Sequence, residues 1–257
     1  MKLKFIHLNI FMGGLFWDNL VSFLKSEQPD ILAMQEVYEC ADPNAQPRFN
    51  TLANLQKVLA LPYKAYAPTM RRMSEGKIFL SPAPLWGTAF LSKFPLTQVS
   101  THYLDVPYND HWIDDGQYET SVPRAMQYAT ADVGEAALHL FNVHGIWSTH
   151  GKDTERRLAM SKMIVEKIQD KHPAILCGDF NVNEGTESMN LIGHTMTDLF
   201  RGERVTSFNM KRKPADSGYK DAIVDFVFTS PDVRTLSHKQ PNVDASDHLP
   251  LVCEFEL

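Results

Sequence analysis

Short apolar runs bounded by glycine, proline or acidic residues recur along the chain, and each such run predicts a buried β-strand. The strands expected on this basis are residues 3–10, 31–34, 87–92, 125–133, 137–144, 174–178, 223–229 and 251–257. Gly134 and Glu135 separate two of these strands and predict a hairpin. In the last strand, Glu254 and Glu256 alternate with apolar residues. One face of that strand is therefore expected to meet solvent, as in an edge strand whose charges oppose pairing with another chain.

Apolar residues at helical spacing predict helices between these strands. The expected helices begin at a capping Asp18 or Asn19, cover residues 52–59 before Pro62, and extend from Asp153 or Thr154 to about Lys171. Three long segments show neither period and are rich in polar or turn-forming residues, which is typical of surface loops. These segments are residues 63–85, 105–123 and 183–220.

Strands that alternate with helices, without an internal repeat or a linker, predict one α/β domain over residues 1–257. The hairpins make part of the sheet structure antiparallel. We therefore expect two mixed sheets packed together, with helices on the outside.

Composition narrows the function classes only slightly. The net charge of −6 gives no global basic field that would draw the chain to nucleic acid or anionic lipid, although bound cations could offset this in a nuclease. Three scattered cysteines, Cys40, Cys177 and Cys253, make neither a disulfide nor a zinc framework, which favours a reducing, cytoplasmic compartment. The N-terminal residues are expected to form the first strand rather than a signal peptide. No apolar run is long enough to predict a membrane span, and a monomer is the default expectation.

The polar residues that interrupt the apolar strands are the candidates for chemistry, because a buried polar group is costly unless it has a partner. They fall at or near strand ends and are Asn9, Glu36, His144, Asp179, Asn181, Asp225, Asp247 and His248. If the strand ends converge, Glu36, Asp179 and Asp247 with the amide of Asn9 make an all-oxygen set, which favours Mg²⁺ or Mn²⁺ over zinc. The two histidines would supply nitrogen donors to a phosphoryl group, and Asp225 could orient one of them.

Each candidate also has a structural interpretation. Asp179 and Asn181 could close a strand with an Asx turn, and His144 could be a core histidine with satisfied hydrogen bonds. Asp225 could pair with Lys220 or Arg234. Taken singly, these residues leave the choice open, and the pattern along the whole chain has to decide.

Six segments, in this order, resemble the successive motifs of the endonuclease/exonuclease/phosphatase superfamily. They are Leu8-Asn9-Ile10, residues 29–37 ending in Gln35-Glu36-Val37, Asn142-Val143-His144, Gly178-Asp179-Phe180-Asn181, residues 224–228 beginning Val224-Asp225, and Ser246-Asp247-His248-Leu249-Pro250. The resemblance spans nearly the whole chain and implies a four-layered α/β/β/α sandwich of two packed mixed sheets. It also implies Mg²⁺-dependent hydrolysis of a phosphoester by in-line attack of an activated water.

The resemblance further implies a role for each matched residue. Glu36 would bind the metal with support from Asn9, Asp247 would hold the metal's water shell, and Asn181 and His144 would contact the phosphoryl group. Asp179 would position or activate the water, and His248, oriented by Asp225, would stabilise the transition state. Whether Asp179 or His248 is the general base is left open.

Arg124 and Trp147 are further candidates for substrate binding, as a phosphate clamp and a stacking surface. His144 in its motif is unlike the abasic-site endonuclease branch, so base-excision repair is not expected. The substrate, a nucleic acid or a small or lipid phosphodiester, stays open, because the possible contacts are ambiguous. They are Arg71, Arg72, Arg201, Arg204 and residues 211–213, with Trp86, Trp112 and Trp147 as aromatic surfaces. The alternative function is a binding or scaffold protein of the same fold that has no turnover.

Overall fold

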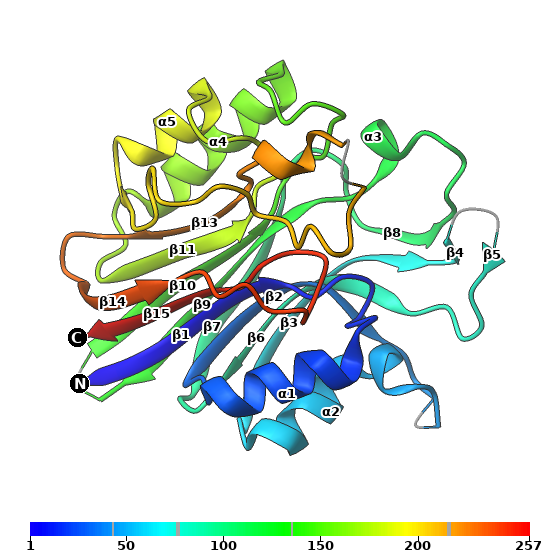
Figure 1. The fold of residues 1–257 in the computed structure, drawn as a ribbon, viewed down its shortest axis with the longest axis horizontal. Coiled ribbons are helices and arrows are strands. Elements are labelled where there is room, and N and C mark those ends of the chain that lie inside the picture. Colours follow the sequence, from blue (N-terminus) through cyan, green and yellow to red (C-terminus); the bar gives the residue numbers. More distant parts are fainter. Residues whose placement is uncertain (43, 76–77, 135, 215–216) are drawn as a thin grey trace.

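Two mixed β-sheets face each other, and helices cover the outer face of each sheet, so the chain forms an α/β/β/α sandwich (Figure 1). The computed structural model describes residues 1–42, 44–75, 78–134, 136–214 and 217–257. This arrangement confirms the fold class expected from the sequence. Among the helices in these ranges, none is long and apolar enough to cross a membrane.

The first sheet has seven strands, and the strands from the two chain ends, β1 and β15, are neighbours in it. Its order is β14 (Arg234–Lys239), β15 (Leu251–Glu256), β1 (Lys2–Asn9), β2 (Ile31–Glu39), β6 (Leu85–Ser92), β3 (Tyr63–Arg72) and β8 (Asn109–Trp112). The β1–β2 and β3–β8 pairs are parallel, and the other pairs are antiparallel. Helices α1 (Trp17–Glu27) and α2 (Thr51–Leu59) pack on its outer face through an apolar cluster that includes Leu20, Leu24 and Leu55.

The second sheet has six strands. Its order is β12 (Thr197–Asp198), β13 (Asp225–Thr229), β11 (Ala174–Asp179), β10 (Ala136–His144), β9 (Ala125–Val133) and β7 (Leu96–Tyr103). The β10–β11 pair is parallel. Helices α4 (Glu155–Ile168) and α5 (Glu187–Gly193) cover the outer face (Figure 1). The smaller elements are α3 (Tyr118–Ser121), β4 (Ser74–Glu75), β5 (Ile78–Phe79) and the 3₁₀ turns η1 (Pro47–Phe49) and η2 (Gly218–Asp221).

The expected loops at 63–85, 105–123 and 183–220 were wrong in part. β3 occupies the first of them, because the small residues Ala65 and Ala67 fill its buried face and give a weak apolar pattern. The second holds β8 and α3, where Trp112 is 1% exposed. The third contains α5 and β12.

Two further expectations about single elements differ from the structure, and two are confirmed. The last strand is not at an edge, since β15 lies between β14 and β1. Helix α1 begins at Trp17 without a side-chain cap, whereas Thr154 caps α4 as expected by accepting a hydrogen bond from the amide of Arg157. The hairpin between β9 and β10 forms as expected, although its turn residue Glu135 is outside the described residues.

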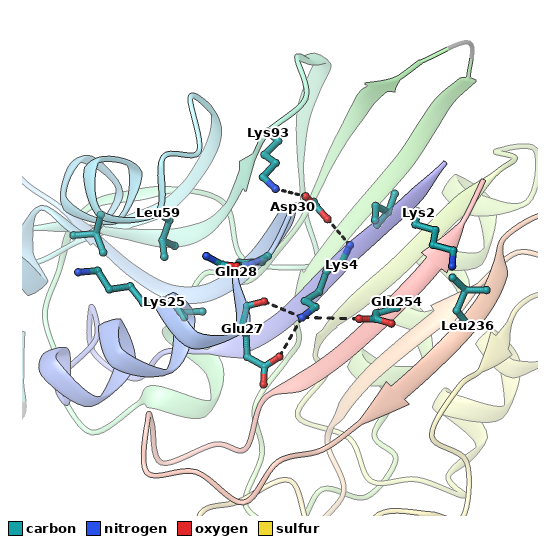
Figure 2. A pocket seen from close by; sticks show the side chains of 14 residues that line it. Lys2, Lys4, Lys25, Glu27, Gln28, Asp30, Leu59, Lys93, Leu236 and Glu254 are labelled. Carbon is teal, nitrogen blue, oxygen red and sulfur yellow. Dashed lines mark hydrogen bonds and ion pairs between the residues drawn. The ribbon is translucent and has the colours of Figure 1, made fainter.

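One end of the sandwich carries a cleft of about 480 Å³ between α1 and the first residues of β1 and β2. Figure 2 shows that several of its charged side chains pair with one another: Lys4 Nζ lies 3.6 Å from Glu27 Oε2 and 3.9 Å from Glu254 Oε1. Lys93 Nζ lies 2.5 Å from Asp30 Oδ1. These ion pairs join α1, β1, β15 and the start of β2, so they have a structural role.

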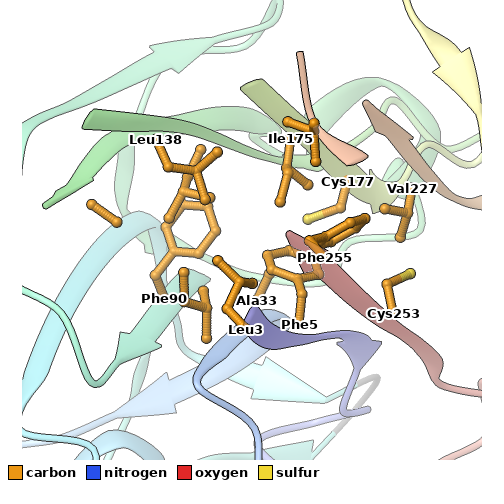
Figure 3. Packing of buried hydrophobic residues seen from close by; sticks show 14 of the residues in the cluster. Leu3, Phe5, Ala33, Phe90, Leu138, Ile175, Cys177, Val227, Cys253 and Phe255 are labelled. Atoms are coloured by element: carbon orange, nitrogen blue, oxygen red, sulfur yellow. The ribbon is translucent and has the colours of Figure 1, made fainter. Parts of the chain in front are cut away.

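The apolar core between the two sheets fills the same end of the sandwich as this cleft. Figure 3 shows side chains from both sheets interdigitating there, among them Phe5, Phe90, Leu138 and Ile175. Strand side chains alternate between faces, so every second residue of β1 and β10 enters this layer. The same inward-facing positions continue along each strand toward the other end of the sandwich.

Candidate active site

The inner face of five strands changes from apolar to polar at one common end. In β1 the inner positions run from Leu3 and Phe5 to His7 and Asn9. The inner positions of the other strands end at Gln35 in β2, Asn142 and His144 in β10, Asp179 in β11 and Asp225 in β13. The register explains the convergence, since Asp179 is paired with His144 on one side and with Asp225 on the other.

Asp179 lies at the centre of this cluster and is 2% exposed. Its Oδ2 accepts a hydrogen bond from Asn9 Nδ2 at 3.0 Å and lies 3.7 Å from His144 Nε2 and 3.9 Å from His248 Nε2. Burial is the main reason that the pKa of Asp179 rises to about 6, although the charge of His248 opposes the rise. A carboxylate with such a pKa can exchange a proton near neutral pH.

The Asn9 amide also connects Asp179 to Glu36. Asn9 Nδ2 donates to Glu36 Oε1 at 3.3 Å, and the amide of Met12 donates to Glu36 Oε2 at 2.9 Å. Glu36 sits at a bulge in β2 and has a φ of 59°, a left-handed conformation that is uncommon for a residue with a side chain. The bulge turns the carboxylate out of the strand's regular alternation and toward Asn9.

His248 and Asp225 form a buried pair beside Asp179. His248 Nδ1 donates to Asp225 Oδ2 at 2.8 Å, and Asp225 is fully buried. Burial alone would lower the pKa of His248, but the carboxylates of Asp225, Asp247 and Asp179 outweigh it and raise the pKa to about 10. Burial opposes the ionised form of Asp225 as well, yet His248 and His7 hold its pKa well below the usual range. The pair is therefore an imidazolium and a carboxylate at neutral pH.

Arg124 and His144 form a second buried pair on the other side of Asp179. A guanidinium nitrogen of Arg124 donates to His144 Nε2, and another donates to the hydroxyl of Tyr118 at 3.1 Å. Burial and the charge of Arg124 lower the pKa of His144 well below its ordinary value, so the imidazole is neutral. Among the described residues no carboxylate pairs with Arg124, and its buried Nε has no hydrogen-bond partner. The structural alternative to a phosphate clamp, a salt bridge from Arg124 to a nearby aspartate, is therefore not formed among the described residues.

Asn181 follows Asp179 in a turn rather than in a continued strand. Its φ is 58°, its amide donates to Asp179 Oδ1 at 3.0 Å, and its Nδ2 donates to the carbonyl of Gly145 at 3.1 Å. The Asx turn considered from the sequence is thus present, and it presents Asn181 at the site. Gly145 permits this close approach, since a Cβ there would lie 2.0 Å from the carbonyl oxygen of Phe180.

Asp247 lies at the outer side of the cluster and is 3% exposed. Its Oδ2 accepts from Lys213 Nζ at 2.6 Å, and the neighbouring Ser246 hydroxyl donates to the carbonyl of Asn9 at 2.7 Å. The Lys213 ammonium also lies 4.6 Å from the ring centroid of Tyr219 and 5.0 Å from that of Phe208. Phe208 in turn packs on the His248 ring, with centroids 4.5 Å apart.

The structure thus brings together the eight residues expected from the strand ends, and it places Arg124 against His144. Trp147 lies at the rim, where its ring meets Tyr118 edge to face at a centroid distance of 5.5 Å. Sequence reasoning missed two neighbours, His7 and Lys213. The position of His7 two residues before Asn9, on the same strand face, was the available signal for it. Lys213 lies in a basic tract, and no sequence pattern distinguishes it from its neighbours there.

The oxygen atoms of this cluster could hold a magnesium ion only with help from water and substrate. Among the described residues no three His, Cys, Asp or Glu side chains form a complete metal-binding group. Mg²⁺ typically binds one or two carboxylates and keeps several waters, whereas structural zinc needs a closed set of protein ligands. Glu36, supported by Asn9, therefore fits Mg²⁺ or Mn²⁺ and not structural zinc.

Two of the basic residues considered for nucleic-acid contact are buried and bonded inside the protein. Arg204 is 6% exposed and its Nη2 lies 2.7 Å from Asp198 and 2.9 Å from Glu184. Arg72 is 5% exposed and donates to the hydroxyl of Tyr38. Of the three tryptophans considered, Trp86 and Trp112 are 1% exposed, which leaves Trp147 as the accessible one.

The fold and this cluster agree with the comparison against known proteins. The chain belongs to the endonuclease/exonuclease/phosphatase family, whose sequence profile matches residues 7–248. That range includes every residue of the cluster, and it confirms the family resemblance read from the six motifs. Comparison with curated protein sequences finds no match.

Several solved structures share the fold. An endonuclease/exonuclease/phosphatase from Beutenbergia cavernae has a TM-score of 0.78 at 16% identity, over 100% of this chain and 72% of that chain. A mannosyl-6-phosphatase from Bacteroides thetaiotaomicron has a TM-score of 0.69 at 17% identity, over 99% of this chain and 100% of that chain. The human nocturnin catalytic domain has a TM-score of 0.67 at 18% identity, over 99% of this chain and 93% of that chain. At these identities the likeness establishes a common fold.

Proposed function

We propose that the protein is a Mg²⁺-dependent phosphoesterase that hydrolyses a phosphodiester or phosphomonoester by in-line attack of water. The observation that carries this proposal is the environment of Asp179. A desolvated carboxylate meets Asn9, His144 and His248 within 4 Å, beside a buried imidazolium–carboxylate pair. Such pairs of titratable groups with opposite pKa shifts are typical of acid–base sites.

In this proposal Asp179 accepts the proton of the attacking water, because its pKa of about 6 leaves it ionised yet basic at neutral pH. His248, with a pKa of about 10, stays protonated and stabilises negative charge on the phosphoryl oxygens. Asp225 keeps the imidazolium oriented through the bond to Nδ1. These pKa values favour the aspartate over the histidine as the general base.

The phosphoryl group would meet donors from two further directions. Arg124 has a buried Nε without a partner, and a guanidinium is suited to the planar array of phosphate oxygens. Asn181 presents its carboxamide beside Asp179. Positioning of the phosphoryl group between fixed donors contributes much of the rate in phosphoryl transfer.

Glu36 and Asn9 would hold the magnesium ion, and Asp247 would hold the waters around it. When bound, Mg²⁺ supplies Lewis-acid stabilisation of the phosphoryl oxygens and of the leaving group. Mn²⁺ has the same preference for oxygen ligands and is expected to substitute.

The test is hydrolysis of a panel of phosphoesters with Mg²⁺, with Mn²⁺ and with EDTA. The panel includes bis-p-nitrophenyl phosphate, p-nitrophenyl phosphate, single- and double-stranded DNA, RNA, sphingomyelin and sugar phosphates; the last follow from the mannosyl-6-phosphatase among the similar structures. We expect metal-dependent turnover that Asp179→Asn abolishes and that the exposed control Asp170→Asn retains. Metal-independent turnover, or equal rates in Asp179→Asn and wild type, would contradict the proposal. Absence of turnover on the whole panel would favour a binding protein of the same fold.

A further inference from the structure

A pocket of about 320 Å³ opens directly beside the proposed site. Asn181 belongs to both, and Phe208, which packs on the His248 ring, forms one wall. The group attached to a phosphoryl centred on Asp179 would therefore enter this pocket. Its volume lies at the small end of the range for ligand sites, which suits one ring rather than a polymer segment.

The pocket is held open by hydrogen bonds that do not depend on a ligand. Arg157 is fully buried in α4 and donates to the carbonyls of Ile146, Ser148 and Lys152 and to that of Asn181. These bonds fix the segment after β10 against the turn after β11. A binding surface fixed in this way avoids the entropic cost of ordering a loop when the ligand binds.

The lining of the pocket is aromatic and neutral. Trp147, Phe208 and Tyr219 offer ring surfaces, and Asn181, Asn183 and the segment 148–151 offer polar atoms. None of the described residues that line it is Asp, Glu, Lys or Arg. Aromatic faces favour flat or ring-shaped groups, and the Lys213 ammonium against the Phe208 and Tyr219 rings disfavours a cationic group.

One atom of the lining indicates the polarity that the ligand must have. Asn183 Oδ1 is buried and has no hydrogen-bond partner among the described residues, while its Nδ2 donates to the carbonyl of His150 at 3.5 Å. A buried acceptor without a partner costs free energy unless a ligand supplies a donor. A rotation of the Asn183 side chain would bring this oxygen to the pocket surface, where a ring with a hydroxyl or an amino group can donate to it and an acyl chain cannot.

We propose, on the basis of the proposed function, that the substrate is a phosphoester of an uncharged ring that carries hydrogen-bond donors, and that this ring binds in the pocket formed by Trp147, Asn183, Phe208 and Tyr219. Two kinds of molecule share this chemistry, a sugar and a nucleoside. Double-stranded DNA does not fit, because its bases are stacked and paired inside the duplex and cannot enter the pocket.

The experiment compares kcat/KM for a hexose phosphate, a nucleoside monophosphate and the acyclic control glycerol phosphate. We expect at least one ring substrate to exceed glycerol phosphate by roughly tenfold or more, given the usual worth of ring stacking. Trp147→Ala and Asn183→Ala should remove most of that preference, because each should lower kcat/KM for the ring substrate more than for glycerol phosphate. Tyr63→Ala, which removes an exposed ring at the start of β3, is the matched control.

Direct binding separates failure of this inference from failure of the proposed function. The sugar and the nucleoside without phosphate are titrated into Asp179→Asn by calorimetry, with and without the Trp147→Ala change. If the protein hydrolyses bis-p-nitrophenyl phosphate but neither prefers ring substrates nor binds the rings, the pocket inference is overturned and the proposed phosphoesterase activity is retained. Ring binding that depends on Trp147, in a protein that hydrolyses nothing, would keep the pocket and overturn the enzyme.

A second inference rests on a different observation, the position of His7 behind Asp225. His7 is fully buried and its Nε2 donates to Asp225 Oδ1 at 2.9 Å, opposite the bond from His248. Gln35 Nε2 lies 3.3 Å from His7 Nδ1, and also donates to Asn142 Oδ1. A carboxylate only accepts, so His7 is fixed as the Nε2–H tautomer with Nδ1 accepting from Gln35.

The geometry assigns His7 as a positioning residue. It holds the second oxygen of Asp225, and Asp225 then presents one lone pair to His248 in a fixed direction. A hydrogen bond to the far side of a carboxylate fixes the direction in which that carboxylate faces a catalytic group, as similar bonds do for metal ligands. His7 itself touches neither the proposed substrate position nor Asp179.

The test compares His7→Gln, which keeps an amide donor, with His7→Leu, which removes it. We expect His7→Leu to lower kcat by roughly tenfold or more with little change in KM, and His7→Gln to recover much of the loss. The Nδ1–H proton resonance of His248 should shift in His7→Leu and return toward its position in His7→Gln. Equal kcat in both variants, with the His248 resonance at its wild-type position, would overturn the assignment. If His7→Leu does not fold, the position of the His248 resonance in His7→Gln is the measurement that tests it.

Discussion

At the scale of single residues, the site consists of polar groups in positions that an apolar side chain would otherwise occupy. Asp179 follows Ile175 and Cys177 on the inner face of β11, so its charge is buried where the core would continue. Its raised pKa means that the folded state favours the protonated form. The carboxylate therefore destabilises the fold at neutral pH unless a cation is near.

We expect Asp179→Asn to be more stable than wild type in EDTA at pH 7.5. An acid whose folded-state pKa is raised binds its proton more tightly when folded, so wild-type stability falls as pH rises from about 4 through 6. Asparagine has no such titration, and the expected gain is on the order of 1–2 kcal/mol. Thermal unfolding of both proteins at pH 4 and pH 7.5 measures it, with Asp170→Asn as the control. A variant that is less stable at pH 7.5 would contradict this account.

The candidate residues could be predicted because each one breaks an apolar run at a strand end. His7 and Gln35 were harder to identify, because a polar residue inside a strand has no obvious partner until the register is known. The pairing of Asp179 with Asp225 across β11 and β13 is also invisible in the sequence. Nothing in the basic tract predicted that Lys213 would face Asp247, since that contact joins segments 34 residues apart.

At the scale of elements, the loops behind the site are fixed by helix ends. Asp153 precedes α4, yet its carboxylate accepts from the amides of Glu187 and Ser188 at the start of α5. It also accepts from the hydroxyl of Ser188. Burial is the largest single influence and opposes ionisation, but these donors together outweigh it and lower the pKa of Asp153. The bond joins the two helices that cover the second sheet.

We expect Asp153→Ala to destabilise the protein by about 0.5–1 kcal/mol at pH 7, the lower part of the range for a lost helix cap, because the carboxylate is exposed and solvent screens it. A lowered folded-state pKa gives stability that is present above the unfolded value near 4 and is lost as pH falls through the folded value. The difference from wild type should therefore shrink below about pH 4. Chemical unfolding at pH 7 and pH 3 measures it. A difference independent of pH would show that the charge is not involved.

Helices with a strong apolar period were predicted well, and strands with small buried residues were not. α2 lies where Leu52 and Leu55 placed it. β3 was missed because Ala65 and Ala67 carry little apolar signal and Pro68 suggests a break. Both alanines are buried, and at such positions the space available, rather than hydrophobicity, determines which residue fits.

At the scale of the whole molecule, the layer between the two sheets is apolar at one end and polar at the other, and the ion-paired cleft lies outside the first sheet near the apolar end. A ligand that stabilises the folded protein by binding at the site should therefore depend on residues of the polar end and not on residues of the other end. Glu36 and Glu254 are carboxylates of the same sheet at the two ends, which makes them a natural pair of test positions.

We expect Mg²⁺ to raise the unfolding temperature, because an ion that binds only the folded state stabilises it by mass action. At one hundred times the dissociation constant the gain is about 2.7 kcal/mol. Glu36→Gln should reduce the Mg²⁺-dependent shift and raise the metal concentration needed for turnover, whereas Glu254→Gln should alter neither. Scanning calorimetry over a Mg²⁺ series measures it, and an equal shift in Glu36→Gln would remove Glu36 from the metal site.

The two chain ends lie side by side at the end of the sandwich away from the site (Figure 1). β1 and β15 are antiparallel neighbours, and the amide of Leu257 donates to the carbonyl of Met1 at 3.0 Å. A short peptide could therefore join residue 257 to residue 1 without disturbing the sheet, and the chain could be reopened at an exposed turn elsewhere. Such a circularly permuted protein would keep every residue of the polar end in place. The order in which these motifs occur along the chain is thus a matter of ancestry, and their arrangement in space does not require it.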